Sequence, residues 1–363
     1  MRTIYCEIDL AKLTHNYRLL QDQAGRSAVV AVVKADGYGH GDYQVALALQ
    51  QAGCQYFAVA RVHEGVKLRQ AGVGRNILIM GGAFPGEFED MCRFSLTPVV
   101  SCRENLEEMV AAGLRGLGVH LKVDTGMNRL GIHSDDLGGV VHTLRQSGFT
   151  LLGLMSHMAC ADEIQSPVNQ LQLDRFQVAL ASLPAAERPA LCHIANSATL
   201  FHFHRAEDFS LVRSGIMLYG GNPVPEVSIP LQPVMTLKTR VLQVKRLAVG
   251  EGVSYGHNFR ATRPMQIAVI AVGYADGYPR LLSNKARVLI GGRFAPVLGN
   301  VCMDMTMIDV TGRPVSRGDE VVLFGTQGEQ VLHAQELADI CGTIDYEIFC
   351  GISQRVERVY ING

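Results

Sequence analysis

Residues 28–41 read AVVAVVKADGYGHG, and this stretch decides the fold. Ala28–Val33 is a short apolar run rich in β-branched residues, with glycines at positions 25, 37 and 39 on either side. This pattern predicts a strand that is buried on both faces, as in a parallel sheet. Lys34 stands at the end of this strand, before a glycine-rich turn, which is where α/β folds place their chemistry. A partly desolvated lysine loses its proton easily and reacts with aldehydes, so Lys34 is a candidate nucleophile; alone, it could equally be an exposed residue that opens a loop.

The chain up to residue 228 alternates between short apolar runs and segments of helical period. Eight such runs with helical segments between them are typical of a (β/α)8 barrel of the TIM type, with its site at the carboxyl ends of the strands. We therefore predict an α/β fold in which residues 1–228 form this barrel. The expected strands are Ala28–Val33, Tyr56–Ala60, Ile77–Met80, Thr97–Val100, Val119–Val123, Leu151–Ser156, Ala190–Ile194 and Ser210–Val212.

The alternation of apolar runs with helical segments ends near residue 229. Four prolines between residues 223 and 233 interrupt any regular element, as an interdomain linker does. Beyond them, apolar runs predict a mainly β domain over residues 229–363, and the first strand of the chain, residues 3–9, is a candidate to pair with it. The strands expected in this domain are Val234–Leu247, Gln266–Val272, a hairpin at Arg287–Leu298, Val301–Val310, Glu320–Phe324 and Gln354–Ile361, with one helix at His333–Ile340.

Composition and charge exclude several classes of function. The chain has 363 residues, 18% of them charged, and a formal net charge of −1, without a block of Lys or Arg. Nucleic acids and anionic membranes are therefore not expected partners. No apolar stretch approaches the ~20 residues of a membrane span, and the start of the chain lacks the apolar core of a signal peptide. The nine cysteines are scattered without a C-x-x-C pair, which predicts reduced residues of a cytoplasmic protein and no zinc site.

Polar side chains follow several of the expected strands, and a barrel would bring them to one cavity. Taken singly, His157 is more often a core histidine and Ser197 more often a helix N-cap. With a tyrosine, the Ser197 hydroxyl and the backbone N–H groups of Gly215 and Ile216 would form a phosphate-binding cup. Metal ligation is the weaker interpretation, because no His/carboxylate cluster has ligand spacing. The strand-end residues are Lys34, Tyr38, Lys122, residues 124–129, His157, Asn196, Ser197, Arg213, Ser214, Gly215 and Ile216.

A phosphate cup beside a nucleophilic lysine indicates pyridoxal phosphate (PLP) held as a Schiff base. The residue that faces the pyridine nitrogen then decides the chemistry. Arg213 cannot accept a proton, so an arginine there would leave this nitrogen unprotonated and a substrate carbanion less delocalised. Such a site favours rapid reprotonation at Cα over transamination, and racemisation requires this behaviour.

These residues lie in motifs that resemble those of the alanine racemase family. Each motif alone would be weak, but together they follow the family's order and extend over essentially the whole chain. The motifs are Val33–Gly41, Lys122–Gly131, Met155–His157, Asn196–Ser197, Arg213–Gly220, Ser254–Gly256, Gly273–Gly277, Cys302–Asp304 and Asp345–Glu347.

The resemblance implies an isomerase that interconverts L- and D-alanine through a PLP external aldimine, in a head-to-tail homodimer with shared active sites. It implies that Lys34 carries PLP and serves D-alanine, while Tyr255 of the partner subunit serves L-alanine on the opposite face of Cα. Arg129 and Met303 would bind the substrate, and Arg129 is also the cation that would let Tyr255 act as a base. The other implied cofactor ligands are Tyr38, Ser197, Gly215, Ile216 and Tyr346 for the phosphate, and Arg213 for the ring nitrogen with His157 behind it.

Departures from the family's pattern are minor. Asp36 and Gly37 stand where the family commonly has Asn-Ala, and Ser214 stands where it commonly has Pro. Neither change removes a functional group. Lys122 beside Arg129 would place two cations together. Some family members carbamylate this lysine, and we hypothesise the same here.

Three other functions compete with this interpretation. A PLP-dependent decarboxylase would need an acidic partner for the ring nitrogen, which Arg213 contradicts. A barrel that only binds and carries PLP would need neither Tyr255 nor the β domain. A broad-specificity or serine racemase is closer, but such enzymes typically look secreted and carry cysteine pairs. The sequence therefore favours a cytoplasmic alanine racemase over these alternatives. Supply of D-alanine for peptidoglycan is one role that the resemblance implies, and D-alanine breakdown, which would use the same reaction, is not distinguished from it by the sequence.

Overall fold

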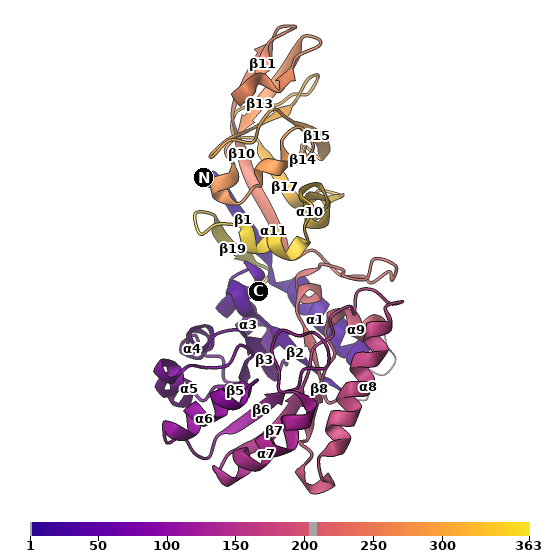
Figure 1. Cartoon of the computed structure of the whole chain (residues 1–363). Helices are drawn as coiled ribbons and strands as arrows, with labels where there is room; N and C mark the ends of the chain where they lie inside the picture. Colours follow the sequence, from indigo (N-terminus) through magenta and orange to yellow (C-terminus); the bar gives the residue numbers. More distant parts are fainter. Residues whose placement is uncertain (1, 203–208) are drawn as a thin grey trace.

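A computed structural model of the chain describes residues 2–202 and 209–363. A barrel surrounded by helices forms one part, and an elongated β domain extends away from it (Figure 1). No helix within the described residues is long and apolar enough to cross a membrane.

Eight parallel strands form the barrel sheet, in the order β8-β7-β6-β5-β4-β3-β2-β9. A parallel bridge between Asn196 and Arg213 joins the two ends of this sheet and closes the barrel. All eight predicted strands are confirmed, with ends that differ by at most two residues. Their bounds are β2 (Ala28–Val32), β3 (Tyr56–Val59), β4 (Asn76–Ile79), β5 (Thr97–Val100), β6 (Gly118–Lys122), β7 (Thr150–Met155), β8 (Leu191–His193) and β9 (Leu211–Ser214).

Burial on both faces explains why these strands read as continuous apolar runs. Residues 29–32 of β2 are each 5% exposed or less. Val30 pairs with Tyr56 of β3 on one side and with Arg213 of β9 on the other. Strands covered on both faces favour unbroken Val/Ile/Leu runs over alternation. The residues after each strand therefore meet at one rim of the barrel.

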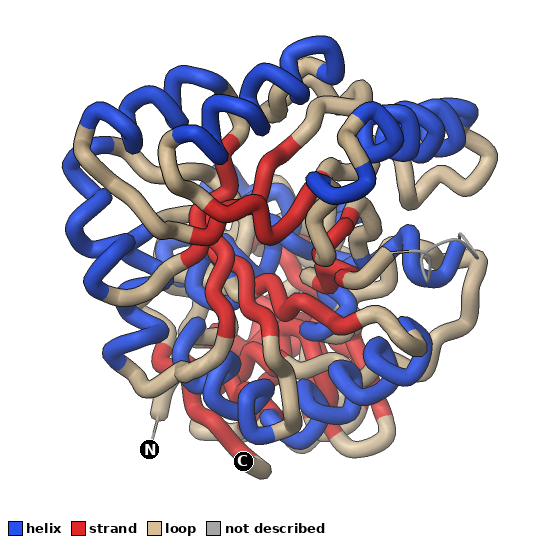
Figure 2. Tube along the Cα trace, turned by 90° about the horizontal axis from the view of Figure 1, so that it is seen from below, coloured by secondary structure: helices blue, strands red, loops and turns tan. Residues whose placement is uncertain are grey.

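Helices surround the strands, as Figure 2 shows in a view from below. The first helix follows directly from a strand of the β domain, and Asp9 caps it by accepting hydrogen bonds from the N–H groups of Ala11 and Lys12 (3.0 and 3.1 Å). The helices of this layer are α1 (Leu10–Ala24), α3 (Asp42–Gln51), α4 (Val62–Gln70), α5 (Phe88–Arg93), α6 (Arg103–Ala111), α7 (Leu137–Gln146), α8 (Pro167–Ser182) and α9 (Ser197–His202).

The β domain is built on a nine-stranded sheet in the order β18-β17-β14-β15-β16-β13-β10-β1-β19. An additional pairing of β17 with β10 closes six of these strands into a ring. The chain termini contribute to this domain, because β1 lies between β10 and β19. The bounds are β1 (Ile4–Asp9), β10 (Met235–Leu247), β13 (Met265–Ile270), β14 (Arg287–Ile290), β15 (Arg293–Leu298), β16 (Thr306–Asp309), β17 (Glu320–Gln327), β18 (Gln330–Leu332) and β19 (Glu357–Ile361).

Smaller elements complete the β domain. A short hairpin of β11 (Gly252–Val253) and β12 (Phe259–Arg260) lies at its end away from the barrel (Figure 1). Helices α10 (Ala334–Cys341) and α11 (Asp345–Gly351) pack beside the sheet. The strand predicted over Val301–Val310 is wrong in extent, because only Thr306–Asp309 are extended and paired. The carbonyl oxygens of Cys302 and Met303 instead accept hydrogen bonds from the N–H groups of Tyr274 and Ala275 (both 3.0 Å).

Candidate active site

Lys34 lies directly after β2, at the carboxyl rim of the barrel. It is partly buried, and burial lowers the pKa of its ammonium group, with the positive charge of Arg129 acting in the same direction. A lysine with a lowered pKa is more often neutral and therefore nucleophilic. The position and environment both suit a group that forms a covalent bond to a carbonyl.

Arg213 is the most buried cation of the site, with 3% of its surface exposed. Its Nη2 donates to the carbonyl oxygen of Ser156 (2.6 Å) and to Nδ1 of His157 (3.0 Å). Its Nη1 donates to Nδ1 of His193 (2.7 Å). Because these acceptors occupy N–H groups on both Nη1 and Nη2, they fix the orientation of the guanidinium before any ligand binds.

A chain of histidines extends from Arg213 into the barrel interior. An arginine can only donate, so Nδ1 of His193 must accept, which leaves the proton of this ring on Nε2. That proton reaches Nδ1 of His120, 2.8 Å away. The sequence interpretation missed His120 and His193; the one available signal was that His120 stands two residues before Lys122, on the same face of β6.

The histidine chain predicts a loss of stability in acid. Burial lowers the pKa of His120 to about 4 and that of His193 well below its usual value. Between the usual value of about 6.5 and pH 4, the unfolded chain therefore binds protons that the folded chain does not, so the free energy of unfolding falls as the pH falls. For His120 alone this amounts to about 3 kcal/mol.

Urea unfolding of the protein at pH 7.5, 6 and 5, at one protein concentration, measures this effect. His120→Gln should flatten the pH dependence, whereas His133→Gln, at a side chain 70% exposed, should leave it unchanged. An equally steep dependence in wild type and His120→Gln would contradict the prediction.

The five residues predicted to hold a phosphate lie together. The N–H of Gly215 donates to Oγ of Ser197 (3.0 Å), and Ile216 follows directly. The ring of Tyr38 lies 5.7 Å from that of Tyr346, which α11 supplies from the β domain. A Cβ atom at Gly215 would collide with the Tyr38 hydroxyl, so this hydroxyl lies against the Gly215 backbone. Two tyrosine hydroxyls, the Ser197 hydroxyl and the main-chain N–H of Ile216 form a donor set that fits a phosphate, while the Gly215 N–H is directed at Ser197 Oγ.

Four cations, Lys34, Lys122, Arg129 and Arg213, lie close together at this rim of the barrel. Lys122 is 7% exposed, and burial lowers its pKa to about 8, with Arg129, Arg213 and Lys34 acting in the same direction. The pKa of His157 is held well below its usual value first by burial and then by these same four cations, so all of them lie near it. The site is therefore prepared for an anionic ligand.

Tyr255 and Met303 are not brought to Lys34 within one chain. Tyr255 follows β11 at the far end of the β domain and is 74% exposed (Figure 1). Met303 is 53% exposed in a turn, and Cys302 beside it contacts Ser254 (3.2 Å). The two predicted residues thus share one exposed region of the β domain, remote from the barrel rim.

Comparison with known proteins decides the family. One family model, "Alanine racemase, N-terminal domain", matches residues 8–223, and another, "Alanine racemase, C-terminal domain", matches residues 234–360. The chain belongs to the alanine racemase family. An alanine racemase of Symbiobacterium thermophilum is 45% identical to it, over 99% of this chain and 97% of the relative.

Solved structures agree with this family membership. The alanine racemase of a D-cycloserine-producing Streptomyces lavendulae superposes with a TM-score of 0.93 at 35% identity, over 100% of this chain and 98% of that one. The alanine racemase of Bartonella henselae, solved with covalently bound pyridoxal phosphate, superposes with a TM-score of 0.90 at 31% identity, over 99% and 100%.

The residues that depart from the common family pattern have distinct environments. Oδ1 of Asp36 accepts a hydrogen bond from the N–H of Asp42 (3.2 Å) and lies 3.4 Å from Nζ of Lys67. The Ser214 hydroxyl is buried and has no hydrogen-bond partner among the described residues. The first departure thus adds an ion pair near Lys34, whereas the second adds an unpaired polar group to the core.

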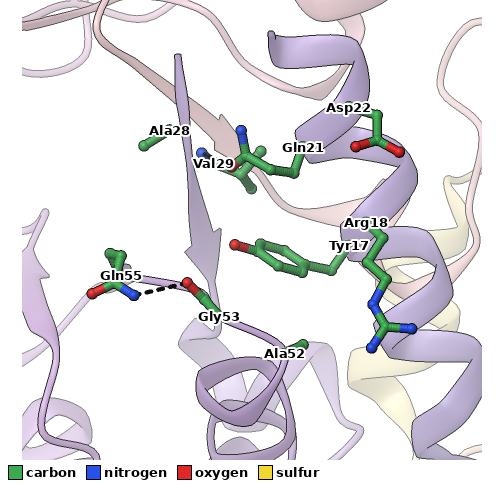
Figure 3. Close-up of a pocket in the computed structure, with 9 residues that line it drawn as sticks. All are labelled: Tyr17, Arg18, Gln21, Asp22, Ala28, Val29, Ala52, Gly53 and Gln55. Carbon is green, nitrogen blue, oxygen red and sulfur yellow. Dashed lines mark hydrogen bonds between the residues drawn. The ribbon is translucent and has the colours of Figure 1, made fainter. Parts of the chain in front are cut away.

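A cavity of about 290 Å³ lies at the opposite end of β2 (Figure 3). Residues of α1, the start of β2 and the loop after α3 line it, and Gln55 donates to the carbonyl oxygen of Gly53 across its floor (2.9 Å). None of the alanine racemase site residues predicted above lines this cavity. The chemistry therefore belongs to the Lys34 end of the strand.

Proposed function

We propose that the protein is an alanine racemase that interconverts L- and D-alanine with PLP as its cofactor. The observation that carries this proposal is that a partly buried lysine and a buried arginine, Lys34 and Arg213, both lie near His157 in the barrel, with the proposed phosphate ligands Ser197 and Gly215 in contact with each other. The names of the relatives support the same reaction.

The residues present fit the phosphate, the aldehyde and the ring nitrogen of PLP. Tyr38, Ser197 and the Gly215–Ile216 backbone would hold its phosphate together with Tyr346, and Lys34 would hold its aldehyde carbon. Arg213, which donates to His157, would also donate to the ring nitrogen. Unlike a carboxylic acid at this position, a guanidinium would not give this nitrogen a proton. When bound, PLP draws electrons from Cα of an attached amino acid and makes the Cα proton acidic.

Two bases on opposite faces of Cα would then move this proton. Lys34 takes or returns the proton on the D-alanine face, and Tyr255 of the partner subunit does so on the L-alanine face. A free tyrosine has a pKa near 10, so its phenolate needs a neighbouring cation. Arg129 would supply this charge and bind the alanine carboxylate, and its exposure and its effect in lowering the pKa of Lys34 support this role.

A homodimer would complete each site. The region of the β domain that carries Tyr255 and Met303 also exposes Tyr274, Leu281 and Met305, and exposed apolar side chains of this size commonly mark an interface. In a two-fold dimer the same region of each subunit can reach the barrel rim of the other. We further propose that the enzyme is cytoplasmic, divides as residues 1–228 and 229–363 with the first strand pairing with the second part, and supplies D-alanine for peptidoglycan.

Exchange of the α-proton tests the proposed function. PLP-loaded protein is incubated with L-alanine in D2O while optical rotation, deuterium at Cα and product identity are followed. Deuterium uptake with loss of rotation supports racemisation. PLP absorbance without exchange would indicate a cofactor carrier, carbon dioxide and an amine would indicate a decarboxylase, and equal rates with serine would indicate broad specificity.

Lys122 is expected to carry a carbamate. Because its pKa is lowered to about 8, a larger share of Lys122 is neutral amine near pH 7.5 than for an ordinary lysine near 10.4. The ammonium group first loses one proton, and the neutral amine then adds to carbon dioxide and releases a second, so that a cation beside Arg129 becomes a carbamate anion. The 13C NMR spectrum in 13C-bicarbonate should show a carbamate signal that Lys122→Met lacks; a bare wild-type ammonium at high bicarbonate would contradict this prediction.

A further inference from the structure

The backbone after Lys34 is left-handed over four consecutive residues. In α2 (Lys34–Tyr38), φ is 53° at Ala35, 54° at Asp36, 59° at Gly37 and 54° at Tyr38. Each residue with a Cβ atom costs about 1–2 kcal/mol in this conformation. Only Gly37 adopts it freely, so other contacts must hold the turn that sets the direction of Lys34.

Hydrogen bonds inside the turn satisfy most of its N–H groups. Gly37 donates to the carbonyl oxygen of Val33, Gly39 to that of Ala35 (both 3.0 Å), and Gly41 to that of Asp36 (2.8 Å). The N–H of Ala35, directly after Lys34, bonds instead to a side chain from another element. It donates to Oε1 of Glu64, at 2.7 Å.

Glu64 is itself held by the neighbouring strand end. Its Oε2 accepts from the N–H groups of Ala60 (2.8 Å) and Arg61 (2.9 Å), which follow β3 and lead into α4. One carboxylate thus joins the carboxyl ends of β2 and β3 through three short, charge-assisted hydrogen bonds. Lys67 lies one turn further along α4. Its Nζ is 2.7 Å from Oδ1 of Asp42, at the start of α3, and 3.4 Å from Oδ1 of Asp36, within the turn itself.

We propose that Glu64 is the positioning residue of Lys34: by anchoring the Ala35 N–H to the end of β3, it holds the left-handed turn and aims the Lys34 amine at Cα. This inference rests on the proposed function for its kinetic consequence. Loss of the anchor lets the amine move away from the line of proton transfer, and a displacement of about 1 Å can lower a rate about 100-fold.

Glu64→Gln tests the proposal, because the amide keeps the size of the side chain but cannot accept at both ends. The two enantiomers of alanine have equal free energy, so kcat/KM must fall by the same factor in both directions. We expect a fall of about 10–100-fold. The primary isotope effect distinguishes the bases: it should rise for α-deuterated D-alanine, whose proton Lys34 removes, and stay constant or fall for α-deuterated L-alanine.

Hydrogen exchange of the Ala35 amide in PLP-loaded protein without substrate supplies a readout independent of activity. This amide should exchange faster in Glu64→Gln. Glu87→Gln is the matched control. Glu87 accepts from the N–H of Phe84, three residues before it (3.0 Å), as Glu64 accepts from that of Arg61, but it lies in a different loop. It should change neither the exchange rate of the Ala35 amide nor the isotope effect. Should Glu64→Gln fail to fold, Glu64→Asp keeps the charge but is one methylene too short to join both strand ends.

An unchanged Ala35 exchange rate, or a folded variant with an unchanged isotope effect on D-alanine, would overturn the role of Glu64. A wild-type protein that does not exchange the alanine α-proton would instead overturn the proposed function. The Ala35 amide would still decide in that case whether Glu64 holds the turn.

Discussion

Lys34→Ala is expected to abolish racemisation and to remove the absorbance of the lysine-bound cofactor. Lys34 is proposed both to hold PLP covalently and to act as one of the two bases. Alanine can do neither. Loss of a single general base costs about 10²–10⁴-fold, and loss of the covalent attachment adds to this. The variant should retain some PLP, because the phosphate ligands are untouched.

Activity and the absorbance spectrum of the variant measure the two roles separately. Lys285→Ala, at an exposed lysine of the β domain, should behave as wild type in both. If Lys34→Ala kept the absorbance of a lysine-bound cofactor, another residue would have to be the one that binds PLP covalently. Lys122 would be the first to test, because its pKa is also lowered.

The barrel and most of its site could be predicted because both follow from local patterns. Runs such as residues 28–33 reveal buried parallel strands, and a closed barrel brings the residues after such strands to one rim. This is why Lys34, Ser197 and Arg213 could be placed together although they are far apart in the chain.

The features that sequence patterns did not reveal depend on tertiary contacts. The hydrogen bond between His120 and His193 joins residues 73 positions apart, on two strands, β6 and β8, that the sheet places on either side of β7. The left-handed turn has Ala, Asp and Tyr at positive φ, where local preferences favour glycine, so local preference does not predict it; one of the hydrogen bonds that hold it comes from Glu64, 29 residues away. The apolar run Val301–Val310 predicts a strand that includes Met303, but the Met303 carbonyl oxygen accepts instead from the N–H of Ala275, a contact that a local pattern does not reveal.

Tyr255→Phe is expected to separate exchange from racemisation. The ring remains, so packing changes little, but the phenol oxygen that would move the proton on the L-alanine face is gone. Racemisation should fall about 10²–10⁴-fold, the usual contribution of a general acid–base group. Lys34 is intact, so D-alanine should still exchange its α-proton with D2O while remaining D-alanine.

NMR of the Cα signal together with optical rotation measures both processes in one sample. Tyr274→Phe is the matched control, because Tyr274 is also exposed on the β domain and is assigned no proton to move. Equal losses of exchange and racemisation with D-alanine in Tyr255→Phe would argue against one base on each face. Equal activity of Tyr255→Phe and wild type would remove Tyr255 from the mechanism.

Mixing the two inactive variants decides whether the site is shared between subunits. Tyr255 lies at the far end of the β domain from the barrel, so one chain cannot supply both bases as it stands (Figure 1). In a heterodimer of Lys34→Ala and Tyr255→Phe, one site would contain both altered residues, and the other would contain neither. Random exchange of subunits makes half of the dimers mixed, so about a quarter of all sites should become active.

A preparation made from two differently tagged Lys34→Ala chains should stay inactive, which excludes an effect of mixing itself. If each chain formed its site alone, every site in the mixed dimer would carry one defect, and no activity would return.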